Sequence, residues 1–207
     1  MNISILEIGE LATMIADEVE KARPISRGAI TSVASLAPID ERTDLCILIS
    51  EHPCQKVART LDDRCFERGI PFLPMIVEHP FLFIGPVANL DGSVCYHCFS
   101  DRYAQHNPIS HIASVVDKHY EDRLSHGPKG VHPGDVAFWS QWLLYSFETG
   151  FESFARTVAR VHLLTRENVT SPVVPVHGCP RCGLHKDERT RSYADLLTHF
   201  GDREVLA

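Results

Sequence analysis

The chain has 207 residues, of which 44% are hydrophobic and 23% are charged, as is ordinary for one globular domain with a substantial core. Its formal net charge of −7 argues against a general nucleic-acid-binding surface. No stretch approaches the ~20 apolar residues of a membrane span, and the start of the chain lacks the features of an export signal. We therefore expect a cytoplasmic protein whose seven cysteines stay reduced.

The first half of the sequence alternates between predicted strands and helices. A short apolar run followed by apolar residues at helical spacing predicts a strand and then a helix within residues 1–22. The elements expected next are a short strand at 30–33, a buried strand at 44–50, a helix at 53–68, and two strands at 70–77 and 81–86. This order predicts an α/β fold.

The opening strand–glycine–helix unit is typical of nucleotide-binding folds, but the glycine-rich phosphate loop is missing. The segment reads Gly9-Glu10-Leu11-Ala12-Thr13-Met14, with no second glycine and with a glutamate that would repel a phosphate. The sequence therefore favours a unit that binds no nucleotide.

Two C-x-x-C pairs are the strongest functional signal. They are Cys95 with Cys98 and Cys179 with Cys182, and glycines flank the second pair. Two such turns supply the four tetrahedral thiolates of a structural zinc site, which has no open position for water or substrate. The sequence therefore predicts Zn²⁺ held by Cys95, Cys98, Cys179 and Cys182, joining the end of the chain to its middle.

Other uses of these cysteines fit less well. A thioredoxin-type redox site needs one C-x-x-C and not two, and disulfides need an oxidising compartment. Three histidines close to the pairs are candidate ligands, although four thiolates suffice: His97, His177 and His185. The unpaired cysteines are expected in the core or in helices: Cys46, Cys54 and Cys65.

The second half is predicted to be mainly helical. Residues 111–120 are expected to form a helix with Ile112, Val115 and Val116 facing inward, followed by an exposed loop at 125–135. A wide aromatic stripe predicts helix over 136–164, with a break at Gly150, and favours core packing over a dimer interface. A short strand at 173–176 and a helix at 193–200 complete the prediction.

Several of these segments together resemble a known family. Gly69-Ile70-Pro71-Phe72, Gly85-Pro86, the stretch from Gly92 to Phe99, and Gly178–Cys182 occur in the order found in ThiF/MoeB-like proteins, the fold of ubiquitin-like-protein activating enzymes. The similarity is greater to the truncated, McbB-type members that partner YcaO enzymes in making azoline- and azole-modified peptides. It covers roughly residues 1–185.

The resemblance implies a fold and an organisation. The fold would be a truncated ThiF-like, Rossmann-like α/β sheet with a zinc-stapled C-terminal helical lobe. Residues 1–94 would form a degenerate ThiF-like half, residues 95–185 a zinc-stapled crossover and helical segment, and residues 186–207 a C-terminal helix and tail. McbB-type proteins carry a peptide-recognition module ahead of this unit, so leader-peptide binding here is expected to use another surface or subunit.

The resemblance also implies a role. The chain would be a non-catalytic partner of a YcaO-type cyclodehydratase that acts on a ribosomal precursor peptide, with a homodimer as a possible assembly. Active members of the fold hold Mg²⁺-ATP with a glycine loop, basic residues and an aspartate after the buried strand. Here Glu51, Lys56 and Arg59 are the only substitutes at these places. Two alternatives stay open: an ATP-dependent enzyme that adenylates a C-terminal carboxylate, and a zinc-stabilised interaction module.

Overall fold

A computed structural model describes residues 1–33, 36, 39–121 and 123–183. Its strands are β1 (Ile3–Ile8), β2 (Ser26–Ala29), β3 (Leu45–Ser50), β4 (Phe72–Glu78), β5 (Phe81–Ile84), β6 (Thr157–His162) and β7 (Asn168–Pro172). Its helices are α1 (Glu10–Ala22), α2 (Gln55–Glu67), α3 (Tyr96–His106), α4 (Ser110–Glu121) and α5 (Pro133–Thr149), with a 3-10 turn, η2 (Glu152–Phe154).

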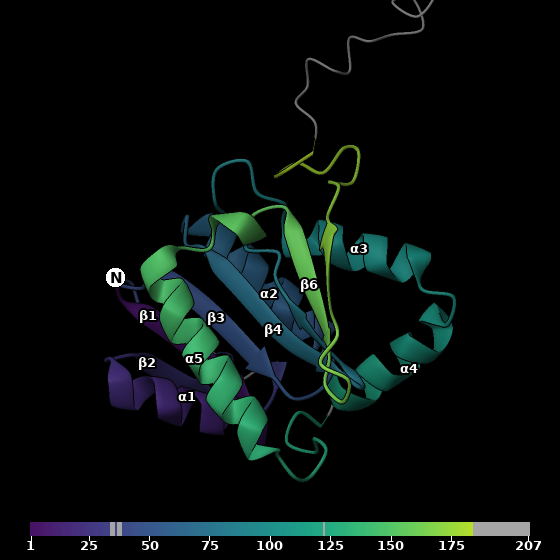
Figure 1. Cartoon of the computed structure of the whole chain (residues 1–207). Coiled ribbons are helices and arrows are strands. Elements are labelled where there is room, and N and C mark those ends of the chain that lie inside the picture. Colours follow the sequence, from purple (N-terminus) through teal and green to yellow (C-terminus); the bar gives the residue numbers. More distant parts are fainter. Residues whose placement is uncertain (34–35, 37–38, 122, 184–207) are drawn as a thin grey trace, which may run out of the picture.

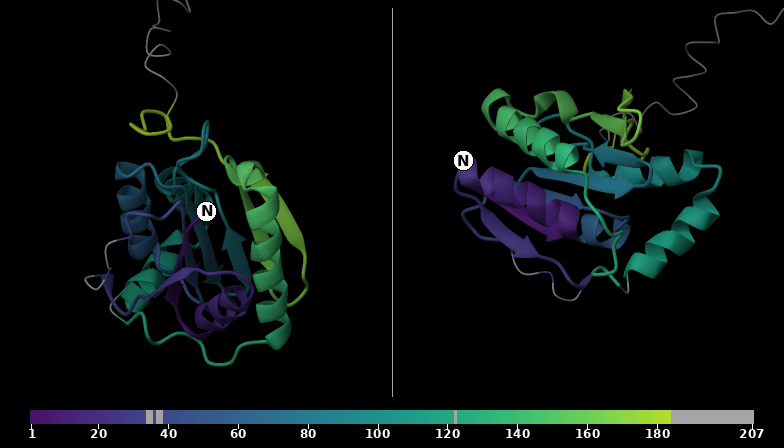
Figure 2. Two further views of the ribbon diagram at one scale, coloured as in Figure 1. Left: turned by 90° about the vertical axis from the view of Figure 1, so that its left-hand side faces the viewer. Right: turned by 60° about the horizontal axis from the view of Figure 1, so that its bottom comes forward.

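All the described strands belong to one sheet of seven strands in the order β2-β1-β3-β4-β5-β6-β7. The first four, β2, β1, β3 and β4, run parallel, whereas β5, β6 and β7 are added antiparallel. Helices α1 and α5 cover one face of the sheet, and α2 and α3 lie on the other (Figures 1 and 2). This arrangement confirms the α/β class.

The central strands β1 and β3 lie in the middle of the sheet because their sequences are almost continuously apolar. Every residue of β1 and of β3 is buried, as expected for parallel strands with helices on both faces. One core lies between the sheet and α1 with α5, and a second lies between the sheet and α2. The second core contains Cys46, Cys54 and Cys65, which confirms the prediction for these three cysteines.

The second strand differs from its prediction. Residues 30–33 are not a strand; β2 precedes them and has the sequence Ser-Arg-Gly-Ala, with no apolar run. Its pairing with β1 is supported by a charged contact, because the Arg27 guanidinium lies 2.7 Å from the buried Glu7 carboxylate. Such a contact between distant residues leaves no local signal in the sequence.

The long helix predicted over 136–164 is correct only in its first part. Helix α5 ends at Thr149, and Gly150, which follows it, has a positive φ of 88° that suits glycine. Residues 157–162 form strand β6, where Val158, Ala159 and Val161 are buried and the backbone pairs with β5 and β7. The strand predicted at 173–176 is wrong as well, since β7 ends at Pro172.

Helix α4 occupies the predicted residues but has the opposite orientation. Ile112, Val115 and Val116 were expected to face inward, yet their exposed fractions are 51%, 69% and 40%. The predicted helix at 193–200 lies outside the described residues. The division of the chain at residues 94 and 185 stays a prediction.

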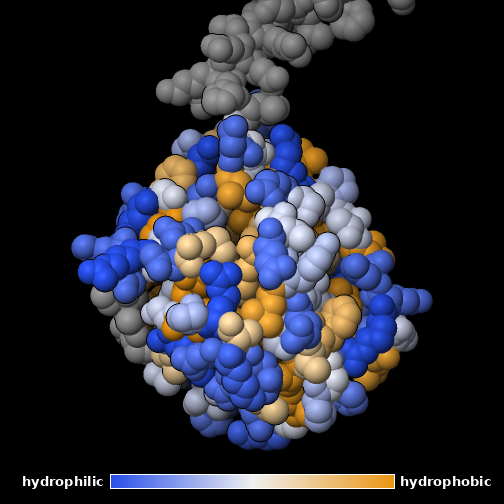
Figure 3. Space-filling model, turned by 60° about the vertical axis from the view of Figure 1, so that its left-hand side comes forward, coloured by the Kyte–Doolittle hydropathy of each residue, from blue (hydrophilic) through white to orange (hydrophobic). Residues whose placement is uncertain are grey.

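The surface over α1 and α5 is mixed, with hydrophobic side chains interspersed among hydrophilic ones (Figure 3). Among the described helices, none combines the length and the apolar composition needed to cross a bilayer.

We predict that Leu61→Ala lowers the free energy of unfolding by about 2–5 kcal/mol, because Leu61 is fully buried in the second core and its truncation leaves a cavity. Chemical denaturation followed by circular dichroism measures the change. Leu164→Ala is the matched control, since Leu164 is 82% exposed. Equal losses of stability in the two variants would contradict this packing.

Candidate metal centre

Four sulfur atoms from distant parts of the chain meet at one point. The Sγ atoms of the two predicted pairs all lie within 4.8 Å of one another. The sulfur of Cys182 is 3.4 Å from those of Cys95 and Cys98, and that of Cys179 is 3.7 Å from those of Cys95 and Cys182. The structure therefore brings together all four cysteines that the sequence singled out.

The first pair is positioned by the start of α3. Cys95 is the residue immediately before the helix and Cys98 lies in its first turn, so both sulfurs lie near the helix N-terminus. The partial positive charge of a helix N-terminus favours thiolate over thiol. Both residues are buried, with exposed fractions of 3% and 1%.

The second pair lies in a tight turn after β7. The amide of Gly183 donates to the carbonyl of Cys179 at 3.0 Å, and a side chain at 183 would collide with the backbone of Cys179. Glycine is therefore required where this turn closes. The last described residues follow from β7 and lie beside the start of α3 (Figure 1).

Backbone amides also point at the sulfurs. The Cys95 amide donates to the Sγ of Cys182 at 3.3 Å, and the Val176 amide donates to the Sγ of Cys98 at 3.2 Å. Such bonds hold metal-binding thiolates in place and partly neutralise their charge.

The protonation of the cluster favours a bound cation. A hydrogen bond from the Cys182 thiol lowers the pKa of Cys95 to about 5. The pKa of Cys182 is raised in turn, because its proton is shared with Cys95, and burial raises the pKa of Cys98 to about 12. One thiolate forms readily, and a cation is needed before its neighbours can ionise as well.

The spacing of the sulfurs suits a tetrahedral ion. Zinc–sulfur bonds of about 2.3 Å in a tetrahedron place neighbouring sulfurs about 3.8 Å apart. The closest sulfurs here are 3.4 to 3.7 Å apart. The four cysteines therefore fit a metal ion with a closed shell of sulfur ligands.

Helix α2 holds both cysteine turns through two adjacent aspartates. Arg181, inside the second pair, donates to the carboxylates of Asp62 and Asp63 at 3.2 and 2.6 Å, and its guanidinium lies over the ring of Phe66. His97, inside the first pair, has its Nε2 atom 3.0 Å from the Asp63 carboxylate. One helix thus fixes the two turns relative to each other.

Asp62 is the buried member of this arrangement. Its side chain is fully buried, and burial raises its pKa to about 6, although the charge of Arg181 opposes the shift. No local pattern in the sequence indicates the role of Arg181, because its partners are 118 and 119 positions away.

Of the three histidines near the cysteines, the two that the structure describes do not join the cluster. His97 contacts Asp63 instead, His177 is exposed, and His185 lies outside the described residues.

At the carboxyl edge of the parallel strands, the chain fills the place where α/β sheets bind ligands. The Glu51 carboxylate accepts from the Leu11 amide at 3.1 Å, at the start of α1, and is 7% exposed. A Cβ atom at Gly9 or at Gly127 would overlap this carboxyl group, so the backbone closes on it from both sides.

The neighbouring helix start is filled in the same way. The Gln55 amide at the start of α2 donates to the Asp117 carboxylate of α4 at 2.9 Å. His52 stacks on Tyr120, with ring centroids 4.1 Å apart, and its Nε2 atom is 2.9 Å from the Leu124 carbonyl. Residues 110–121 and 123–127 therefore cover this edge of the sheet.

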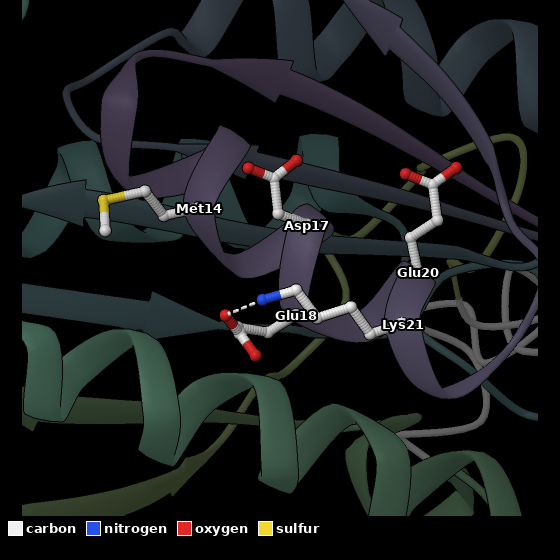
Figure 4. A pocket seen from close by; sticks show the side chains of 5 residues that line it. All are labelled: Met14, Asp17, Glu18, Glu20 and Lys21. Carbon is white, nitrogen blue, oxygen red and sulfur yellow. Dashed lines mark hydrogen bonds and ion pairs between the residues drawn. The ribbon is translucent and has the colours of Figure 1, made fainter.

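A shallow pocket of about 400 Å³ lies on α1, away from the cysteines (Figure 4). Its lining residues are Met14, Asp17, Glu18, Glu20 and Lys21. Asp17 and Glu20 pair with Arg27, and Lys21 pairs with Glu18 at 2.6 Å. These charges already have partners, and we assign no ligand to the pocket.

We predict that Cys98→Ser removes the bound metal, because hydroxyl oxygen is a poor replacement for one of four thiolates. Metal content per chain, measured by atomic emission after purification, should fall at least severalfold. Cys54→Ser is the control: Cys54 is buried but lies outside the cluster, and its variant should keep the metal. Equal metal content in all three proteins would contradict the site.

We predict that Arg181→Ala speeds metal loss to a competing chelator by about 10-fold or more, because contacts that orient the metal ligands commonly change metal affinity about 10- to 100-fold. Arg166→Ala is the control, since Arg166 makes one surface ion pair with Asp135. An Arg181→Ala rate equal to that of the control would show that the α2 contact does not support the site.

Comparisons place the fold among solved structures. No protein-family model matches the sequence, and no curated protein matches it either. The structure is similar to that of the heterocyclase TruD, with a TM-score of 0.58 and 17% identity over 100% of this chain and 29% of that one. The chain thus spans less than a third of the heterocyclase.

Two further similarities cover more of the other protein. A chain of the E. coli microcin synthetase McbBCD complex matches with a TM-score of 0.63 and 16% identity, over 86% of this chain and 67% of that one; that complex also matches with pro-MccB17 bound. E. coli MccB matches with a TM-score of 0.57 and 12% identity, over 89% of this chain and 65% of that one. At these identities, the shared property is the fold.

Proposed function

We propose that the chain is a non-catalytic, ThiF-like partner subunit for YcaO-dependent cyclodehydration of a ribosomal precursor peptide. In this role it binds the precursor, the YcaO-type enzyme or both. It raises the effective concentration of the peptide near an active site on another subunit.

The observation that carries this proposal is the fold together with its cysteines. The chain shares its α/β fold with a heterocyclase and with a chain of a microcin synthetase complex. The same fold here holds four clustered cysteines that join residues 95–98 to residues 179–182. The microcin synthetase complex is also known with its pro-peptide bound, which supports a precursor peptide as a partner.

We assign the metal as structural zinc. Four thiolates are the usual ligand set of structural zinc in reduced proteins, and they leave no coordination position for substrate. The metal would therefore stabilise the docking of the 173–183 segment on α3 and take no part in chemistry.

We propose that the chain does not carry out adenylation, because two of its own carboxylates occupy the places where a phosphate would bind. Glu51 and Asp117 accept the amide hydrogens at the starts of α1 and α2, where a nucleotide phosphate would otherwise bind. A phosphate at either place would be repelled by the negative charge of the carboxylate. At Glu51 it would also be obstructed by the backbone of Gly9 and Gly127, which packs against that side chain. Loss of nucleotide chemistry is compatible with a scaffold role, for which the fold and its surfaces suffice.

The direct experiment is co-expression of the tagged chain with a YcaO-type enzyme and a precursor peptide encoded beside it. We expect a stable complex by pull-down, and cyclodehydration, seen as loss of 18 Da per ring, that depends on this chain. The Cys98→Ser variant should lose both, and Cys54→Ser should keep both. Full modification without the chain, or no association with either partner, would contradict the role.

We also predict that the purified chain does not bind Mg²⁺-ATP in isothermal titration and does not catalyse ATP–pyrophosphate exchange. The reason is the filled edge of the sheet. Saturable ATP binding that Arg59→Ala abolishes would instead favour an adenylating enzyme, because Arg59 is one of the two basic residues of α2 that were expected to contact a phosphate. That outcome would leave the zinc assignment unaffected.

A further inference from the structure

Helix α4 is amphipathic, but its polar side faces the protein. The half-buried residues Ala113, Asp117, Tyr120 and Glu121 recur at the spacing of one helical stripe. Ile112, Val115 and Val116 form the opposite stripe and are 40% to 69% exposed, and Ile109 just before the helix is 54% exposed. We call these four apolar residues the α4 patch.

Specific contacts fix this orientation. The Asp117 carboxylate accepts the amide hydrogen of Gln55 at 2.9 Å, and the Tyr120 ring stacks on buried His52. Glu121 lies 3.7 Å from the ammonium group of Lys56. Rotating the helix to bury its apolar stripe would break all three contacts and leave the amide of Gln55 without its carboxylate. The α4 patch must therefore be covered from outside the described residues, or stay in water.

The chain itself provides a segment with matching properties. Residues Tyr193, Leu196, Leu197 and Phe200 recur at positions i, i+3, i+4 and i+7, which predicts a helix with one apolar face. This stretch and the α4 patch, residues 109–116, each span eight residues, or about 12 Å as a helix. Two apolar stripes of equal length can cover each other.

The attachment point lies within reach. Cys182 is held against Cys98, in the first turn of α3, with their sulfurs 3.4 Å apart. Helix α3, about 16 Å long in all, leads from this turn toward α4. Residues 184–192 connect Cys182 and Gly183 to the apolar stretch and span roughly 30 Å when fully extended. Because the tether is short, the effective concentration of the stretch near α4 is in the millimolar range.

We propose that the C-terminal stretch 193–200 packs its apolar face on the α4 patch of the same chain. The contact removes apolar surface of both partners from water, which neither stretch achieves alone. It also holds α4 over the filled edge of the sheet, since α4 carries Asp117 and Tyr120. This inference does not depend on the proposed peptide-modification role.

Photo-crosslinking in the full chain tests the contact. With p-benzoylphenylalanine in place of Val115, we expect an intramolecular cross-link to the peptide that contains residues 193–200, identified by mass spectrometry. The same group in place of Leu164, which is 82% exposed, is the control and should not link to that peptide. Mixing isotope-labelled and unlabelled protein separates a link within one chain from a link between two copies.

A second pair of variants tests the chemistry of the contact. Leu196→Asp with Leu197→Asp should abolish the cross-link and raise the amide exchange of residues 110–121 by about tenfold, because the helix loses its cover. Thr198→Asp, on the opposite side of the predicted helix, should change neither. A cross-link only between copies, a link to other residues, or exchange unchanged by the double variant would overturn the proposal.

Discussion

Four sulfur atoms within 4.8 Å of one another impose the main constraint on this protein. They can all be ionised only around a cation, so a metal is expected to hold together residues separated by more than 80 positions. The aspartates of α2 support the same junction, because they contact the residues inside both cysteine turns. The antiparallel strands β6 and β7 lie in the sequence between the two cysteine pairs, and they complete the sheet.

At the carboxyl ends of the parallel strands, carboxylates of the chain itself bind the N-termini of two helices. Nucleotide-binding folds leave helix N-termini open there for phosphate, whereas this chain supplies carboxylates of its own, from Glu51 just after β3 and from Asp117 in α4. The backbone amides are satisfied without a ligand, and the sheet gains a packed edge.

Local patterns predicted the parts of the fold that depend on local properties. The buried runs of β1 and β3, the helix α2 and the four clustered cysteines were all recognisable, since each depends on spacing along the chain. Strand β6 was mistaken for helix because its aromatic-rich surroundings share a helical period, while pairing with β5 decides its conformation. The orientation of α4 and the partners of Arg181 depend on contacts between distant residues, which no local pattern records.

The separation of the two cysteine pairs along the chain also determines when the metal site can form during synthesis. Cys95 leaves the ribosome 84 residues before Cys179, and Cys98 leaves it 84 residues before Cys182. Until Cys179 follows, a metal ion can find only half of its ligands. Until β6 has been made, β5 is an unpaired edge of the sheet. The nascent chain therefore passes through a stage with exposed backbone hydrogen-bonding groups, at which edge-to-edge association with other chains competes with correct closure.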